Sequence, residues 1–249
     1  MDIARRHLCA LLGGLTLAAA GMPAIAAGDD AFESRRRRLL EAIARLARET
    51  RHETGRAEFG ERTLAALRKV PRHRFVLPGD ERHAYDDRPL PIGYGQTISQ
   101  PFIVALMTDF LEVQPTDKVL EIGTGCGYQA AVLAELAREV YTIEIVGPLG
   151  REAAQRLKDL GYRNVTVKIG DGYRGWAEHA PFDAIMVTAA APEVPRPLID
   201  QLRPGGRLVI PLGSPSGSQT LYLVEKRRDG KTVRRPLLAV RFVPLTRQP

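Results

Sequence analysis

Hydrophobic residues follow a helical spacing in the first part of the chain. Leu39, Ile43 and Leu46 recur at intervals of three or four within residues 30–48, which predicts an amphipathic helix. Residues 71–101 show no such period and are rich in proline and glycine. We therefore expect a long irregular stretch there, and such stretches inside compact domains are often functional.

From residue 118 onward, short apolar runs alternate with helical patterns. The further predicted elements are helices at 61–70 and 101–110, strand 119–122, helix 128–138, strand 140–145, helix 149–160, strands 164–169 and 182–187, helix 196–202, and strands 208–212, 219–226 and 236–243. This alternation indicates a mostly parallel sheet with helices on both faces. The turn residues Arg228-Asp229-Gly230-Lys231 predict a hairpin between the last two strands, so the C-terminal edge should be antiparallel. The fold class is α/β and Rossmann-like, with a seven-stranded sheet.

The first residues differ in character from the rest of the chain. Arg5 and Arg6 precede an apolar run at 8–21 that is too short to span a bilayer comfortably, and the small residues Ala24 and Ala26 follow. This order is typical of a secretory signal peptide, so we interpret residues 1–27 as one. The alternatives are an N-terminal helix that stays uncleaved and a disordered N-terminus.

The remaining residues, 28–249, are expected to form a single domain. Hydrophobic residues make up 44% of the chain, enough for a sizeable core. The formal charge of +7 is diffuse, and its one dense run, Arg35 to Arg38, is typical of a solvated helix face. Without residues 1–27 the only cysteine is Cys126, which excludes an internal disulfide. None of the five histidines has metal-ligand spacing, so we expect no metal.

A glycine turn follows the first strand of the sheet. Gly123, Gly125 and Gly127 allow the backbone to approach a ligand closely, and the next helix directs its N-terminal N–H groups at that ligand. Glu144 ends the second strand, where a carboxylate accepts hydrogen bonds from ribose hydroxyls. These features predict a nucleotide-type cofactor.

The glycine pattern alone does not separate S-adenosylmethionine (AdoMet) from NAD, because residues 125–130 also satisfy G-x-G-x-x-A. Glu121 precedes the turn, where a carboxylate suits the amino-acid end of AdoMet and repels a pyrophosphate. Asp171, followed by Gly172, comes after the third strand, where it could accept from the adenine amino group. Three acidic residues at successive strand ends favour AdoMet. The alternative for Asp171 is a turn residue that caps the next helix.

Together these residues resemble the protein-L-isoaspartate O-methyltransferase family. The similarity covers roughly residues 35–249. Beyond the AdoMet motif it rests on AYDDRPLPIGYGQTISQP (84–101), GDGYRGW (170–176), PFDAIMVTAAAPEVP (181–195), LRPGGRLVIPLG (202–213) and RFVPL (241–245). The segment 92–101 is the most specific, because it is not part of the general methyltransferase fold.

The resemblance implies a site and a division of the chain. The family's active-site serine corresponds to Ser99, with Thr97 and Gln100 in the same substrate loop, so 28–110 would supply N-terminal helices and this loop. Residues 111–249 would form the AdoMet-binding core. The same resemblance implies cofactor roles for Glu144 and Asp171. Without the resemblance, Ser99 reads as a helix cap before Pro101.

The implied reaction is methyl transfer from AdoMet to the free α-carboxylate of L-isoaspartyl residues in damaged proteins and peptides. Rival interpretations are a small-molecule O-methyltransferase and an inactive AdoMet-binding module. We expect a monomer without a nucleic-acid partner and without stable membrane association once the signal is removed. The compartment stays open, since the family and the AdoMet supply favour the cytoplasm and residues 1–27 favour the periplasm. Cys126 and the signal-like N-terminus depart from typical members.

Overall fold

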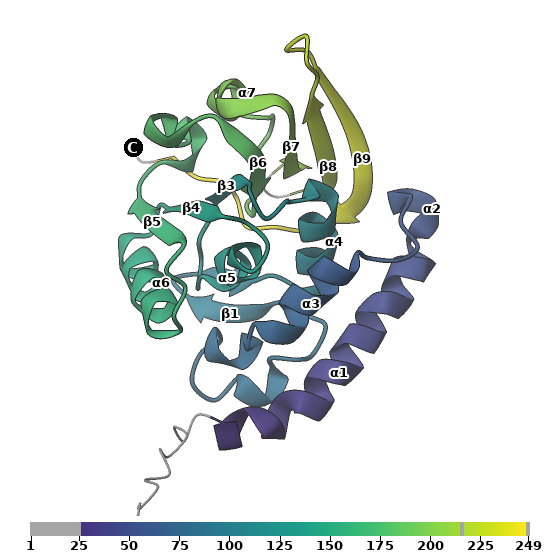
Figure 1. Ribbon diagram of the computed structural model, residues 1–249, viewed down its shortest axis with the longest axis vertical. Coiled ribbons are helices and arrows are strands. Elements are labelled where there is room, and N and C mark those ends of the chain that lie inside the picture. The colour runs from purple at the N-terminus through teal and green to yellow at the C-terminus, as the bar shows by residue number, and fades with distance from the viewer. Residues whose placement is uncertain (1–25, 215–216, 248–249) are drawn as a thin grey trace, which may run out of the picture.

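The computed structural model describes residues 26–214 and 217–247, so nearly all of the expected signal peptide lies outside the described residues. A seven-stranded sheet in the order β5-β4-β3-β6-β7-β8-β9 forms the centre of the molecule (Figure 1). Its strands are β3 (Lys118–Ile122), β4 (Glu139–Glu144), β5 (Val165–Ile169), β6 (Phe182–Val187), β7 (Leu202–Gly213), β8 (Gln219–Lys226) and β9 (Thr232–Val240). The first five strands in space pair in parallel, whereas β7–β8 and β8–β9 pair antiparallel. The predicted sheet and its antiparallel edge are confirmed.

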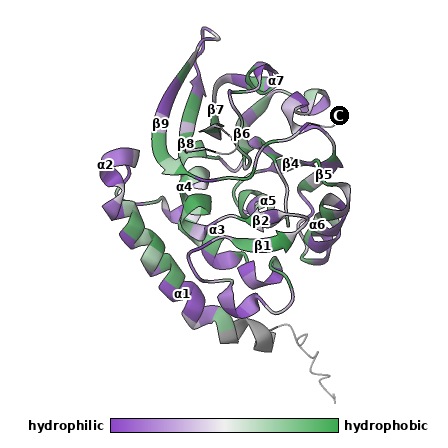
Figure 2. Ribbon diagram, turned by 180° about the vertical axis from the view of Figure 1, so that it is seen from behind, coloured by the Kyte–Doolittle hydropathy of each residue, from purple (hydrophilic) through white to green (hydrophobic). Residues whose placement is uncertain are grey.

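Helices surround the sheet as the alternation predicted. They are α1 (Ala26–Glu49), α2 (Arg51–Thr54), α3 (Glu61–Lys69), α4 (Pro101–Leu111), α5 (Tyr128–Ala134), α6 (Gly147–Asp159) and α7 (Arg196–Gln201). One face of β3, which carries Val119, packs in a core with residues of α1, α3, α4, α5 and α6. The opposite face, with Leu120 and Ile122, packs against α7 and Trp176. Polar and apolar bands alternate along α1 in Figure 2, as expected for a helix that covers a core on one side.

Several elements have different bounds from those predicted; β7, for example, begins at Leu202 instead of residue 208. The helix after the glycine turn ends at Ala134 instead of residue 138, because the chain turns at Leu136 and the Arg138 N–H donates to the Asp117 carbonyl beside β3. The last strand covers Thr232–Val240 instead of 236–243. Because the turn at 227–231 is tight, β9 pairs with β8 from Thr232 onward. The residues after Val240 leave β9 and cross the carboxyl end of the sheet.

The proline- and glycine-rich stretch is more regular than expected. It contains two short 3-10 helices, η1 (Arg72–Arg74) and η2 (Glu81–His83), and a hairpin of β1 (Leu90–Gly93) and β2 (Gln96–Ile98). Residues 93–95 form the turn of this hairpin, and all three have positive φ. The remaining 3-10 helices are η3 (Gly172–Arg174) and η4 (Ala177–His179). The hairpin brings residues 96–98 to the carboxyl end of the large sheet.

The arginine run on α1 lies mostly in solvent. Arg35, Arg37 and Arg38 are exposed, as the charge pattern predicted. Arg36 differs, because it is partly buried and donates to the Tyr85 hydroxyl. In the part of the chain that the structure describes, no helix is long and apolar enough to cross a membrane.

Candidate functional site

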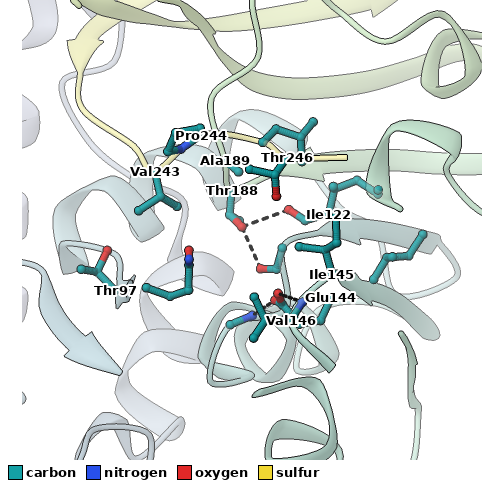
Figure 3. A pocket seen from close by; sticks show the side chains of 16 residues that line it. Thr97, Ile122, Glu144, Ile145, Val146, Thr188, Ala189, Val243, Pro244 and Thr246 are labelled. Carbon is teal, nitrogen blue, oxygen red and sulfur yellow. Dashed lines mark hydrogen bonds between the residues drawn. The ribbon is translucent and has the colours of Figure 1, made fainter. Parts of the chain in front are cut away.

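Two adjoining cavities lie where the parallel strands end. The first, drawn in Figure 3, is lined by Gln96, Thr97, Ile122, Gly123, Gly125, Ile143, Glu144, Ile145, Val146, Gly172, Thr188, Ala189, Val243, Pro244, Leu245 and Thr246. The second is lined by Thr97, Ile98, Ser99, Val104, Gly123, Thr124, Gly125, Cys126, Tyr128, Gln129 and Thr188. Thr97, Gly123, Gly125 and Thr188 border both. The carboxyl ends of parallel strands are the usual ligand site of such sheets.

The glycine turn between β3 and α5 forms the wall that the cavities share. Gly123, Gly125 and Gly127 have φ values of +96°, +55° and +90°, a region that strongly favours glycine. A Cβ at Gly123 would lie 2.4 Å from the Thr188 hydroxyl oxygen. The turn therefore needs glycine both for its backbone conformation and for the close approach of β6.

Glu144 reaches the first cavity from the end of β4. Its Oε2 accepts from the Gly125 N–H at 2.8 Å, and its Oε1 accepts from the Val146 N–H at 3.0 Å (Figure 3). Each carboxylate oxygen can accept a further hydrogen bond, so two ribose hydroxyls could be held here. The two backbone amides fix the carboxylate in place before any ligand arrives.

Charge separates the candidate cofactors. Among the described residues that line the first cavity, Glu144 is the one charged residue, and none is a lysine or arginine. A dinucleotide would bring a pyrophosphate into an acidic, otherwise neutral cavity, whereas AdoMet carries a cationic sulfonium. The lining therefore fits AdoMet, and it fits a dinucleotide poorly.

Glu121 lies on β3 just before the glycine turn, as expected, but its side chain is directed away from both cavities. Its carboxyl is fully buried and lines neither cavity. The side chain points to the α5 face of the sheet beside Thr142, its partner in register, whose hydroxyl donates to Oε2 at 2.6 Å. Burial and the nearby Glu144 raise the pKa of Glu121 to about 8, against the lowering effect of the Thr142 hydrogen bond. We expected Glu121 to contact a ligand directly, but its carboxyl reaches neither cavity.

Asp171 performs the turn-capping role that was its alternative interpretation. Its Oδ1 accepts from the Tyr173 N–H at 2.9 Å. Arg174 lies 3.7 Å from its Oδ2. Asp171 is not in the lining, but Gly172 is, and a Cβ there would lie 2.3 Å from Ile122 Cγ2. Asp171 directly precedes this lining residue, and its carboxylate can accept further hydrogen bonds beside the cap.

The substrate loop borders the second cavity. Thr97 and Ser99 line it, whereas Gln100 does not. Gln100 is the N-cap residue of α4 but makes no side-chain cap hydrogen bond. Asp87 supplies the cap instead, since its Oδ1 accepts from the Phe102 N–H and its Oδ2 accepts from the Gln100 amide, both at 2.8 Å. The capping interpretation of Ser99 is therefore wrong.

Sequence reasoning missed two contributors to the site. Thr188 borders both cavities, and its hydroxyl lies 2.8 Å from the Gly123 carbonyl oxygen and 3.0 Å from that of Ile122. Its place directly after a buried strand was the signal that could have found it. Residues 243–246 cross the carboxyl end of the sheet, held by hydrogen bonds of Ala190 with Val243 and Leu245. No local pattern reveals this crossing.

Cys126 lines the second cavity but is poorly suited to act as a nucleophile. The thiol of Cys126 is buried, and burial raises its pKa, which opposes formation of the nucleophilic thiolate. Within residues 26–214 and 217–247, no cluster of three histidine, cysteine or acidic side chains could hold a metal ion.

Comparison with known proteins identifies the family. The model described as Protein-L-isoaspartate(D-aspartate) O-methyltransferase matches residues 48–249. The chain belongs to the protein-L-isoaspartate O-methyltransferase family. A member from Polaromonas sp., named protein-L-isoaspartate O-methyltransferase 2, is 61% identical over 210 residues, which are 84% of this chain and 100% of the relative. A member of the same name from Syntrophobacter fumaroxidans is 52% identical over 244 residues, 98% of this chain and 99% of the relative.

Solved structures of the family have the same fold. One protein-L-isoaspartate O-methyltransferase matches with a TM-score of 0.74 and 28% identity, over 84% of this chain and 65% of that longer chain. A Plasmodium falciparum protein described as a putative member, in complex with S-adenosyl-L-homocysteine, matches with a TM-score of 0.70 and 25% identity. That match covers 86% of this chain and 99% of the other.

Proposed function

We propose that the protein transfers a methyl group from AdoMet to the free α-carboxylate of L-isoaspartyl residues in damaged proteins and peptides, which starts their repair. Family membership over residues 48–249 supports the proposal. The observation that carries it is the shared border of the two cavities, one lined by Glu144 and the other by Ser99. A cofactor in the first cavity and a carboxylate in the second would meet at Thr97 and Thr188.

The residues act mainly by binding and orientation. AdoMet, when bound, supplies an electrophilic methyl group on a cationic sulfur, and its transfer to a carboxylate oxygen yields a methyl ester and S-adenosylhomocysteine. A carboxylate is already ionised at neutral pH, so no residue of the site has to remove a proton. The Ser99 hydroxyl orients the carboxylate for in-line attack, with Thr97 and Gln100 as neighbours in the loop.

The cofactor residues have separate roles in this proposal. Glu144 holds the ribose, the glycine turn accommodates the amino-acid end, and Asp171 with Gly172 borders the adenine. Glu121 acts indirectly, because Thr142 bonds to both Glu121 and Thr124, and Thr124 lines the second cavity. The Glu121 carboxyl thereby supports the glycine turn from below.

A methylation assay tests the function directly. An isoaspartyl peptide and its aspartyl twin, identical in sequence, should differ in initial rate, with methyl ester formed on the isoaspartyl peptide alone. Equal rates would overturn the assignment. Turnover of small phenols or carboxylates without peptide methylation would favour the small-molecule enzyme, and AdoMet binding without any transfer would favour the inactive module.

Compartment and assembly belong to the same proposal. Two compartments are open: the family and the AdoMet supply favour the cytoplasm, whereas residues 1–27 favour export to the periplasm. In this proposal residues 28–249 form one methyltransferase domain, and the protein is a monomer that binds neither nucleic acid nor, once the signal is removed, membranes stably. Mature protein from a periplasmic fraction should begin at Ala27 or Gly28 when its N-terminus is read by mass spectrometry. Recovery of intact Met1 or Asp2 from the cytosol alone would overturn the export interpretation and favour the cytoplasm.

A further inference from the structure

Arg72 is a buried cation directly behind the substrate loop. Its side chain is 0% exposed. Nε donates to the Ala84 carbonyl oxygen and Nη2 donates to the Ser99 carbonyl oxygen, both at 2.8 Å. One planar guanidinium therefore joins η1, the residue after η2 and the substrate loop.

No carboxylate of the described residues forms a salt bridge with this cation, although the more distant Asp87 favours its charged form. Among residues 32–214 and 217–247, no carboxylate oxygen lies within 4.0 Å of the Arg72 nitrogens, and Nη1 has no hydrogen-bond partner. The Tyr128 ring lies 4.9 Å from the guanidinium carbon and supplies a cation–π contact. A buried charge without a counter-ion is costly, and burial lowers the pKa of Arg72. Hydrophobic packing alone would be served better by a neutral side chain.

The contacts of Arg72 converge on one wall of the second cavity. Ser99 and Tyr128 both line it. Asp87 holds the other end of the same segment through Gln100 and Phe102. Arg72 thus fixes the substrate loop at the Ser99 carbonyl, and Asp87 fixes the adjoining residues Gln100 and Phe102.

We propose that Arg72 is a positioning residue for methyl transfer, which holds the Ser99 backbone so that its hydroxyl faces the substrate carboxylate. This inference rests on the proposed function of Ser99. The planar fork of arginine reaches two carbonyl groups in fixed directions, which the point charge of lysine does not reproduce.

The reaction itself argues for positioning over direct electrostatic binding. Methyl transfer from a sulfonium to a carboxylate removes charge from both partners. A cation placed against the carboxylate would stabilise the charged reactant more than the transition state, and would slow the step. Arg72 instead ends on the Ser99 carbonyl oxygen, so it can fix geometry without such contact. Misplacement of a reacting group by about 1 Å can cost roughly 100-fold in rate.

Arg72→Met tests the inference, with Arg62→Met as the matched control. Arg62 also donates to two carbonyl oxygens of separate segments, those of Val113 at 2.7 Å and Leu136 at 2.9 Å, but it lies outside both cavities. Both variants should lower the melting temperature. Only Arg72→Met should lower kcat for the isoaspartyl peptide, by about 10- to 100-fold, with AdoMet affinity by calorimetry within about twofold. Arg72→Lys, which retains the charge and one donor group, should recover part of kcat. If Arg72→Met does not fold, Arg72→Lys is measured in its place.

A double-mutant cycle separates this inference from the function on which it rests. If Arg72 acts through Ser99, loss of Arg72 should lower kcat by less than about threefold in the Ser99→Ala background. Equal losses in both backgrounds, or a kcat for Arg72→Met that matches Arg62→Met, would overturn the positioning role and leave the proposed function intact. A wild-type protein that does not prefer the isoaspartyl peptide would overturn the proposed function itself. Wild-type turnover in Ser99→Ala would overturn both roles.

Discussion

Glu121 and Thr142 are register partners on β3 and β4, and the Thr142 hydroxyl donates a 2.6 Å hydrogen bond to Glu121 Oε2. The other oxygen, Oε1, has no partner among the described residues. A fully buried carboxylate with one unsatisfied oxygen is unfavourable when charged. Glu121 is therefore mainly protonated at neutral pH, in keeping with a pKa of about 8.

This protonation predicts a pH-dependent stability. The folded state binds the Glu121 proton more tightly than the unfolded state does. This tighter binding stabilises the folded protein fully below pH 4.5, and the stabilisation is lost as the pH rises towards 8. Glu121→Gln should remove that loss, because the amide stays neutral. Its free energy of unfolding should exceed that of the wild type by a few kcal/mol at pH 8 and by much less at pH 5, on the order of 1.4 kcal/mol per pKa unit.

Urea unfolding at pH 5, 6.5 and 8 measures the difference. Glu139→Gln, which removes one carboxylate from the partly exposed start of β4, controls for the change in net charge. Parallel stability curves for wild type and Glu121→Gln would show that Glu121 is ionised in the folded protein.

Glu144 should dominate cofactor affinity. Its carboxylate is prepositioned by the Gly125 and Val146 amides, so its hydrogen bonds to a ligand need little reorganisation. Glu144→Ala should weaken AdoMet binding by about 1.5–3 kcal/mol, the scale of hydrogen bonds to a charged group. Calorimetric titration of a folded variant measures this. Unchanged affinity would remove Glu144 from the site.

Ser99→Ala should affect turnover and leave stability nearly unchanged. One hydrogen bond that strengthens in the transition state is worth about 2–4 kcal/mol, or roughly 30- to 1,000-fold in rate. Because Asp87 supplies the α4 cap, the melting temperature should stay close to that of the wild type. Asp87→Ala is the comparison variant, since loss of the cap should cost about 1 kcal/mol of stability. Steady-state kinetics that show wild-type turnover in Ser99→Ala would contradict the role of Ser99.

Local sequence patterns predicted the fold better than the site. Buried strands appear as continuous apolar runs, and glycines with positive φ mark the turn, so β3, the turn and Glu144 at the end of β4 could be read directly. The direction of the Glu121 side chain could not be read in the same way. A strand buried on both faces shows no polar alternation, so the sequence does not tell on which face its one carboxylate lies.

Long-range contacts explain the remaining differences. Asp87 caps a helix that begins fourteen residues later, and Arg72 meets Ser99 across the whole irregular stretch. Capping rules use the residues next to a helix, so they favoured Ser99. Residues 243–246 reach the site only because the chain leaves β9 and crosses the sheet, which depends on tertiary structure.

Gly150 on α6 gives a test of how closely the helix must approach Glu144. A Cβ at this position would lie 2.4 Å from Ile169 Cδ1 and 3.0 Å from Glu144 Cβ. Ile169 is 39% exposed at the end of β5 and can move aside, but Glu144 Cβ is fixed to the strand. Gly150→Ala should therefore displace the Glu144 carboxylate and weaken AdoMet binding.

Two effects on stability oppose each other in Gly150→Ala. Alanine favours the helix by about 1 kcal/mol, whereas the close contacts cost a comparable amount, so the melting temperature should change little while affinity falls by about tenfold. Gly147→Ala is the matched control in the same helix, because its Cβ would meet mainly the flexible end of Arg151, at 3.2 Å. Calorimetric titration of both variants separates the effects. If both bind AdoMet as tightly as the wild type does, the close approach of α6 is needed for packing alone, and the position of Glu144 does not depend on it.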